Sequence, residues 1–203
     1  MHLGEDTYKT ITSSSTEMLF KDRKSKFYGY AFPVEQESEV KPIIESLKKQ
    51  YPNANHFCYA WQVGITQKKY RSNDDGEPKN SAGTPIYGQI QSFGVTDVLV
   101  VVVRIFGGAK LGVSGLINAY RAAAQMALEN ARIETRIIET KLVLRFGYAI
   151  MNQVMRVIKK VNARVVSQEM EKECAIIIAV PRSQTDSIRA ELERIHQLEM
   201  ELR

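Results

Sequence analysis

The stretch that decides the fold is VLVVVVRIFGGAKLGVSGLINAYRAAAQMALENA, which runs from Val98 to Ala131. An apolar run from Val98 to Val103 leads into a turn rich in glycine, and an alanine-rich segment follows. In that segment, apolar residues recur at the i, i+3/i+4, i+7 spacings of one helical face, namely Leu116, Ile117, Tyr120, Ala124, Ala127, Leu128 and Ala131. The stretch therefore predicts a strand, a tight loop and a long helix, with Ser114 as the helix N-cap.

The turn between this strand and helix contains Gly107, Gly108, Gly112 and Gly115, with Lys110 among them. Glycine can adopt a positive φ and bring bare backbone up to a ligand, and the N–H groups at a helix start suit an anion such as phosphate. The spacing matches neither the P-loop nor the dinucleotide fingerprint. Glycine serves equally well to let a strand and a helix pack closely. Both interpretations, a packing connector and an anion site, stay open.

The composition is that of a globular protein. The 203 residues are 44% hydrophobic and 25% charged, and no apolar run is long enough to span a bilayer. Because residues 1–20 are polar, no signal peptide is expected, and we predict a cytosolic protein without membrane contact. Cys58 and Cys174 lie far apart, with no Cys-x-x-Cys or Cys/His cluster, so both are expected to be buried thiols. No metal or cofactor is predicted.

The net charge is mildly positive, with 28 Lys and Arg against 23 Asp and Glu, or +5. An excess of this size is compatible with RNA, the ribosome or another anionic partner, and it is also common in proteins that bind none of these. Four cations gather in one short segment: Lys21, Arg23, Lys24 and Lys26. Such a segment is typical of a solvated strand edge or turn. The aromatic residues directly after it keep RNA contact open as an alternative, because cations hold phosphates while rings stack on bases.

The first part of the chain alternates strands and helices in a pattern that predicts an α+β fold. Residues 1–16 are expected to be a loose polar end. The expected elements are then strands at Glu17–Phe20 and Phe27–Phe32, a helix over 37–51, a strand at His56–Gly64, a polar loop over 66–85, a helix at Pro85–Phe93 and the strand and helix described above.

Within the polar loop, Asp74, Asp75, Gly76, Glu77 and Pro78 form an acidic turn. A calcium loop is excluded, because placing Gly76 at the sixth position would make Arg71 the first ligand. The carboxylates are expected to pair with nearby cations instead. His56 stands at the start of a hydrophobic strand, where the default is a structural histidine and a catalytic or binding role is the alternative.

The last part predicts the order β-α-β-β-α-β, which is that of a ferredoxin-like domain. Its expected strands are Lys141–Gly147, Arg164–Gln168, Glu173–Val180 and Leu198–Leu202, with helices near 150–161 and 188–195. The first and third strands should be central, and the continuously apolar third strand agrees with this. We therefore predict two domains, residues 1–135 and residues 136–203.

Several ordered motifs in the first domain resemble those of the YigZ/IMPACT family. They are Lys24-Ser25-Lys26-Phe27, His56-Phe57-Cys58, the turn Asn73–Pro78 with Ala82-Gly83-Thr84-Pro85, and Val103–Gly108 with Leu111-Gly112, Gly115-Leu116 and Ala119-Tyr120. The last part is similar to the ferredoxin-like domain of bacterial members. The chain departs from the family pattern at Asn80-Ser81 and at Arg121.

The resemblance implies a first domain like the second domain of ribosomal protein S five and domain IV of elongation factor G, and a second domain like domain V of that factor. Eukaryotic relatives regulate translation through protein contacts made by an N-terminal partner-binding module. We expect no such module in this sequence, so that specific role is not carried over. The resemblance brings no established catalytic residues.

Three functional hypotheses follow. The first is a non-catalytic protein linked to translation that binds RNA or the ribosome. Its face would combine Arg23, Lys24, Lys26, Arg104, Lys110 and Arg121 with the His56, Asp75 and Gly107 loops. The second is an enzyme for a phosphorylated small molecule that pairs Asp74, Asp75 and Glu77 with His56 and the glycine loop. The third is a protein-interaction adaptor. Nothing in the sequence indicates the oligomeric state.

Overall fold

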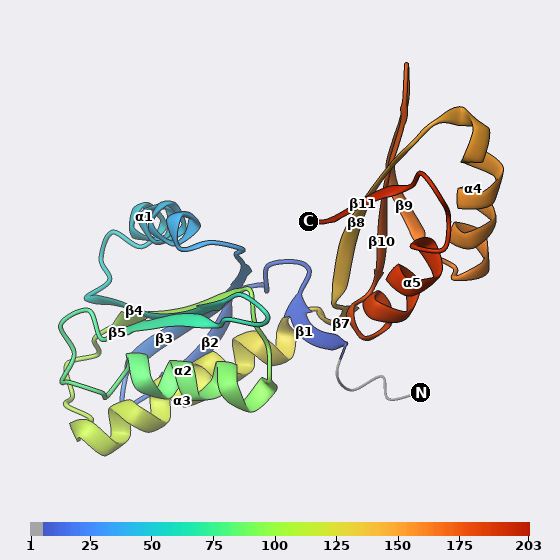
Figure 1. Ribbon diagram of the computed structural model, residues 1–203. Helices are drawn as coiled ribbons and strands as arrows, with labels where there is room; N and C mark the ends of the chain where they lie inside the picture. The colour runs from blue at the N-terminus through green and yellow to red at the C-terminus, as the bar shows by residue number, and fades with distance from the viewer. Residues whose placement is uncertain (1–5) are drawn as a thin grey trace. The chain divides into compact units, whose positions relative to one another are not determined.

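The structure, a computed structural model, describes residues 6–203 (Figure 1). The chain divides into two compact units, of which one is Tyr8–Arg136 and the other contains Ile137–Arg203 together with Asp6 and Thr7. Among these residues, no helix is both long enough and apolar enough to cross a lipid bilayer.

The first unit is built on a five-stranded sheet between two layers of helices. The strand order is β2 (Met18–Asp22), β3 (Ser25–Pro33), β6 (Val98–Ile105), β4 (His56–Val63) and β5 (Lys69–Asn73), with every neighbouring pair antiparallel. One face carries α1 (Val40–Gln50), which follows a 3-10 turn at Glu37–Glu39, and the other carries α2 (Gly83–Phe93) and α3 (Gly112–Asn130) (Figure 1). These hairpins and separate helices confirm the predicted α+β class.

The central strand β6 is buried on both faces, which explains why its sequence is a continuous apolar run. Alternate residues point to opposite faces of a strand. Val98, Val100 and Val102 join the core cluster that contains the α2 and α3 side chains. Leu99, Val101 and Val103 join the cluster on the α1 side. All six are fully buried, and each such side chain stabilises the fold by about 1.5–3 kcal/mol relative to exposure.

Helix α3 lies close to the sheet, as its small residues predict. Ala119, Ala123, Ala124 and Ala127 are fully buried. Opposite them, a Cβ on Gly29 of β3 would lie only 2.3 Å from the carbonyl oxygen of Ala123. The predicted N-cap is wrong. The helix begins at Gly112 after Leu111, which makes no side-chain cap bond, because the positive φ of Gly112 already turns the chain two residues before Ser114.

Three short strands were not predicted. β1 (Thr7–Ile11) pairs with β7 (Ile133–Ile137), although residues 1–16 were expected to be a loose end; residues 1–5 of that segment lie outside the described residues. β5 lies inside the segment predicted as a loop. β1 and β7 are short and more than 120 residues apart, and β5 is an edge strand with four exposed residues of five, so neither periodicity nor local turns reveal them.

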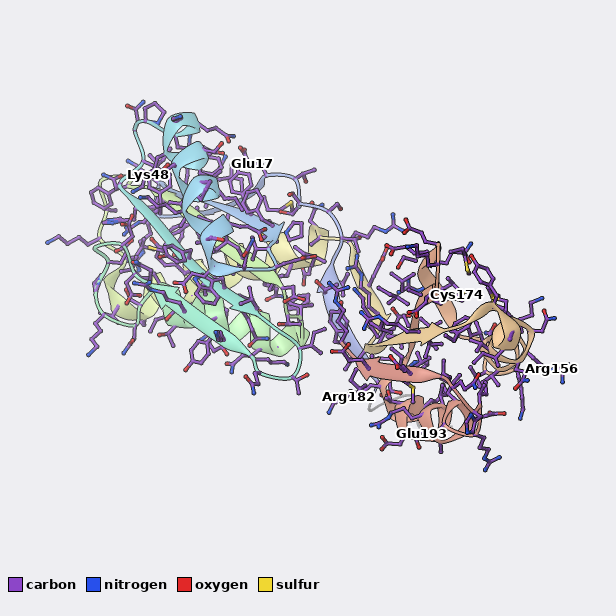
Figure 2. All side chains as sticks on the ribbon, turned by 45° about the horizontal axis from the view of Figure 1, so that its top comes forward. Glu17, Lys48, Arg156, Cys174, Arg182 and Glu193 are labelled. Carbon is purple, nitrogen blue, oxygen red and sulfur yellow. The ribbon has the colours of Figure 1, made fainter. Side chains whose placement is uncertain are left out.

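The second unit is a four-stranded antiparallel sheet with helices on one face. Its strand order is β11 (Glu199–Leu202), β8 (Glu139–Phe146), β10 (Cys174–Pro181) and β9 (Arg164–Met170), so the predicted first and third strands are indeed central. Short 3-10 turns at Tyr148–Ile150 and Arg182–Gln184 precede α4 (Met151–Lys160) and α5 (Thr185–Leu192), which pack on the sheet (Figure 1). Cys174 is buried in this unit, whereas Arg156 on α4 is exposed (Figure 2).

The contact between Gly29 and α3 gives the first prediction. A methyl group at Gly29 meets rigid helix backbone, so Gly29→Ala is expected to lower the free energy of unfolding in urea by about 1–3 kcal/mol. Gly88→Ala is the matched control. Gly88 lies inside α2 with no atom near the position of a Cβ, so this substitution should raise the free energy of unfolding, by up to about 1 kcal/mol. Equal effects of the two substitutions would contradict the close packing.

Candidate functional site

The sheet register brings His56, Arg104 and Phe27 side by side. Arg104, the seventh residue of β6, is paired with His56 of β4 on one side and with Phe27 of β3 on the other. Alternation along β6 places Arg104 on the same face as Val102, which is the face covered by α2 and α3. A charged side chain is therefore turned toward the core at the end of the sheet where the acidic turn and the glycine loop also lie.

Arg104 is held there by a buried ion pair with Glu77. Arg104 Nη1 lies 2.5 Å from Glu77 Oε1, and the two side chains are only 7% and 4% exposed. The hydroxyl of Tyr120 on α3 donates to the same oxygen at 2.7 Å. The guanidinium carbon lies 5.4 Å from the ring centroids of both Phe27 and Phe106. The carboxylate, itself bound by the Tyr120 hydroxyl, and the two aromatic rings thus offset the removal of the charge from water, while Arg104 Nε is a buried donor without a hydrogen-bond partner among the described residues.

His56 and Cys58, at alternate positions of β4, extend this cluster. His56 Nδ1 lies 2.8 Å from the carbonyl oxygen of Asp75, and because a carbonyl only accepts, this nitrogen carries the proton. His56 Nε2 then faces Glu77 Oε1 at 3.9 Å. The Cys58 thiol lies 3.0 Å from the Asp74 carbonyl oxygen and 3.3 Å from the Tyr120 hydroxyl. Burial raises the pKa of Cys58 and that of Tyr120 well above their ordinary values, so both groups are neutral.

The other two carboxylates of the acidic turn bind backbone. Asp74 accepts from the N–H groups of Asn80, Ala82 and Gly83 at 2.8–3.0 Å. Asp75 accepts from the N–H of Phe57 at 2.6 Å. These bonds fix the turn and place Glu77 beside Arg104. Of the predicted acid–base set Asp74, Asp75, Glu77 and His56, only Glu77 brings its carboxylate near the His56 ring, with Oε1 3.9 Å from Nε2. Within residues 6–203, no group of three or more His, Cys, Asp or Glu side chains is placed to hold a metal ion.

A cavity of about 400 Å³ lies over this cluster, at the start of α3. His56, Glu77 and Arg104 line it together with Lys110 and Asn55, and its other lining residues are Pro78, Phe106, Leu111, Gly112, Val113 and Leu116. Phe106 and Val113 are 43% and 54% exposed, although both are large hydrophobic residues. The cavity therefore combines a polar, charge-paired group with apolar walls.

The four glycines divide between the two predicted roles. Gly107 packs directly on the β2–β3 hairpin, because a Cβ there would lie 2.0 Å from the Lys24 carbonyl carbon, and its N–H donates to Ser25 Oγ at 3.2 Å. A Cβ on Gly115 would lie 3.0 Å from that of Leu111. Gly108 and Gly112 instead adopt positive φ, with open space beside the position of a Cβ. Close packing therefore explains Gly107 and Gly115, whereas Gly108 and Gly112 leave exposed backbone that a ligand could approach.

The predicted cations are only partly brought together. Arg23 and Lys24 form the tip of the β2–β3 hairpin, where both adopt the positive φ of a type I′ turn, and Arg23 Nη1 donates to the Lys110 carbonyl oxygen at 3.4 Å. Lys26 does not join them, since alternation from Phe27 places it on the α1 face. Arg121 is exposed on α3, bonds to Asn118 and does not line the cavity.

Tyr120 and Phe106 were not predicted as site residues. Tyr120 was assigned to the apolar helix face, yet it supplies the hydroxyl that binds Glu77. A single tyrosine on a helix face lined by alanines is a usable signal, because its buried hydroxyl requires a polar partner. For Phe106, the sequence offers no comparable signal.

Comparison with known proteins matches residues 23–128 to the family model of the IMPACT N-terminal domain. The chain belongs to the IMPACT family. It is 25% identical over 184 residues to IMPACT family member YigZ of Escherichia coli, covering 90% of each chain. It is 37% identical over 113 residues to IMPACT family member YvyE of Bacillus subtilis, covering 56% of this chain and 52% of that one. The crystal structure of a hypothetical protein, 23% identical, shares its fold over 97% of this chain and 96% of that chain, with a TM-score of 0.67.

The buried ion pair gives the second prediction. Arg104→Met leaves the Glu77 carboxylate buried without its counter-charge, which should lower the free energy of unfolding by about 3–5 kcal/mol. The double variant Arg104→Met/Glu77→Met removes both charges and should be more stable than Arg104→Met alone. Urea unfolding of the wild type, both single variants and the double variant forms a mutant cycle. Strictly additive losses would contradict the coupling.

Proposed function

We propose that this protein binds RNA of the translation machinery through what we name the hairpin–loop surface: Arg23, Lys24, Phe106, Gly108, Lys110 and Gly112. The observation that carries the proposal is the attachment of the cationic hairpin to the glycine loop. Arg23 donates to the Lys110 carbonyl, and Gly107 packs on the backbone of Lys24. Cations, bare backbone and an exposed aromatic ring are thereby held on one surface.

Each part of the hairpin–loop surface suits a component of RNA. Exposed Arg23 and Lys24 attract phosphates, and the N–H groups that begin α3 have no side-chain cap and favour negative charge. Phe106, 43% exposed, offers a ring on which a base can stack. Proteins that bind single-stranded nucleic acid usually combine cationic side chains, which contact the phosphates, with aromatic side chains on which the bases stack.

The folds that we propose for the two units agree with a role in translation. The order β11-β8-β10-β9 with helices on one face supports a ferredoxin-like domain over residues 136–203. For residues 1–135, we propose the fold of the second domain of ribosomal protein S five, as the family resemblance implies. On this basis, the protein acts in the cytosol, and its RNA belongs to the ribosome.

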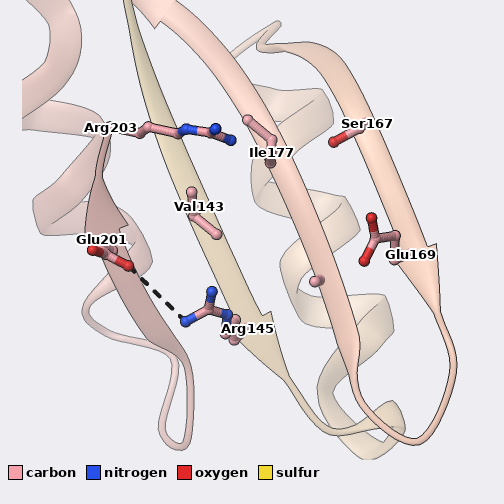
Figure 3. A pocket seen from close by; sticks show the side chains of 8 residues that line it. Val143, Arg145, Ser167, Glu169, Ile177, Glu201 and Arg203 are labelled. Carbon is pink, nitrogen blue, oxygen red and sulfur yellow. Dashed lines mark ion pairs between the residues drawn. The ribbon is translucent and has the colours of Figure 1, made fainter.

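The open sheet face of the second unit is a weaker candidate for RNA. Arg145 and Arg203 lie there beside Glu201 and Glu169, around an apolar strip that includes Ile177 (Figure 3). Arg145 Nη1 lies 4.0 Å from Glu201 Oε2. Because the charges of both signs are interleaved, this face gives a phosphate backbone little net attraction. We therefore assign RNA binding to the first unit.

The third prediction concerns salt dependence. Co-sedimentation with ribosomes should decline steeply as salt rises, because each neutralised phosphate releases counterions. The triple variant Arg23→Ala/Lys24→Ala/Lys110→Ala should bind more weakly. For the triple variant, the plot of log affinity against log salt should be less steep than for the wild type. The magnitude of the slope should fall by about 2–3, because each of the three lost phosphate contacts contributes roughly 0.7–0.9.

The matched control is Arg156→Ala/Lys159→Ala/Lys172→Ala, which removes three exposed cations of the second unit and changes the net charge equally. It should retain the wild-type slope. Absence of binding at low salt, or equal effects of the two triple variants, would refute RNA binding by the hairpin–loop surface. A partner that co-purifies from nuclease-treated lysate while no RNA is bound would instead support the adaptor hypothesis.

A further inference from the structure

The cavity beside the hairpin–loop surface has the size and walls of a small-ligand site. Its volume of about 400 Å³ lies within the range typical of such sites, roughly 300–1,000 Å³. Leu111 and Leu116 are buried in its wall, whereas Phe106 and Val113 stay largely exposed. A flat apolar group placed in the cavity would cover hydrophobic surface that water now contacts.

Phe106 is held as a platform. Its N–H donates to Asn55 Oδ1 at 2.8 Å, which fixes the backbone, and the Arg104 guanidinium lies over its ring. The residue is nevertheless 43% exposed, so part of the ring stays free for stacking. Because the Arg104 charge is already paired with Glu77, the ring can receive an uncharged aromatic group without competing for that cation.

Glu77 adds a hydrogen-bond acceptor to the polar side of the cavity, beside the donors Arg104 and Lys110. Oε1 of the Glu77 carboxylate accepts hydrogen bonds from Arg104 and from Tyr120. The contact with His56 is to the same oxygen. No hydrogen bond is described for Oε2. A carboxylate can only accept, and a nearly buried acceptor gains most from a donor that arrives with a ligand.

A flat apolar ring that carries N–H donors on one edge is the description of a nucleobase. We propose that the cavity takes a single unpaired base, stacked on Phe106 with an amino or imino N–H directed at Glu77. Its phosphate lies outside, next to Lys110 and the start of α3. The inference rests on the proposed function and deepens it, because it adds a base subsite to a surface that otherwise holds only the backbone. A paired base is excluded, since its N–H edge is already engaged.

Three synthetic single strands of nine nucleotides separate the contributions: oligouridine, oligo-N3-methyluridine and a fully abasic strand of the same charge. Uridine has one N–H donor, and methylation removes it while the ring remains. Wild-type protein should bind oligouridine roughly 5- to 150-fold more tightly than the abasic strand, as expected for stacking of one base. The methylated strand should lose a large part of this advantage, because it presents no donor to Glu77.

Phe106→Ala should reduce the preference for oligouridine over the abasic strand toward unity and leave the salt dependence intact. Tyr148→Ala is the matched control, since Tyr148 is an aromatic residue of the second unit that is 53% exposed. If all three strands bind the wild type equally and with strong salt dependence, the base subsite is refuted while RNA binding stands. If the methylated strand binds as well as oligouridine, the Glu77 contact is refuted. If no strand and no ribosome binds, the proposed function itself fails.

Discussion

The site depends on one constraint: strand β6 is buried on both faces from its first residue through its seventh. At that position the sequence has Arg104, so a guanidinium enters the core under α3. A buried cation is tolerated only when a counter-charge and further polar or aromatic groups surround it. Glu77 of the acidic turn supplies the counter-charge and is itself bound by Tyr120 of α3, while Phe27 of β3 and Phe106 of the glycine loop supply the aromatic rings. One buried charge thus ties four separate segments together.

The acidic turn has its form because of that requirement. Asp74 and Asp75 are not chemical groups of the site, since their carboxylates bind the N–H groups of the turn, of α2 and of β4. Their bonds hold a strained loop, in which Asp75 and Asn80 adopt positive φ, and the loop presents Glu77 at the one place where Arg104 needs a partner. Three carboxylates close in sequence therefore divide into two that position the chain and one that carries the charge.

Sequence periodicity predicted the long elements, and the reason is physical. β6, α3 and the β-α-β-β-α-β order each bury a regular apolar pattern that a single sequence displays. β1, β7 and β5 are held by backbone pairing or lie at an edge, and they display no such pattern. In the site, the three motif segments were recognised together, but the contact of Arg104 with Glu77 requires the register of β3, β6 and β4. Strand alternation after Phe27 already places Lys26 on the opposite face, which the grouping of cations overlooked.

The pairing of Arg104 also decides how charge is distributed over the surface. Arg104 belongs to the sequence-predicted anion-binding set, yet its Nη1 lies 2.5 Å from Glu77, so a phosphate there would have to displace a buried carboxylate. That exchange would leave Glu77 without its counter-charge in the core, at a cost larger than one phosphate contact returns. In the proposed complex, phosphate is therefore expected at the exposed cations of the hairpin and the loop. The neutral ion pair inside the cavity is left to interact with groups that carry no charge. In the proposed complex, the pairing of one buried arginine would therefore separate the site for the RNA backbone from the site for the base.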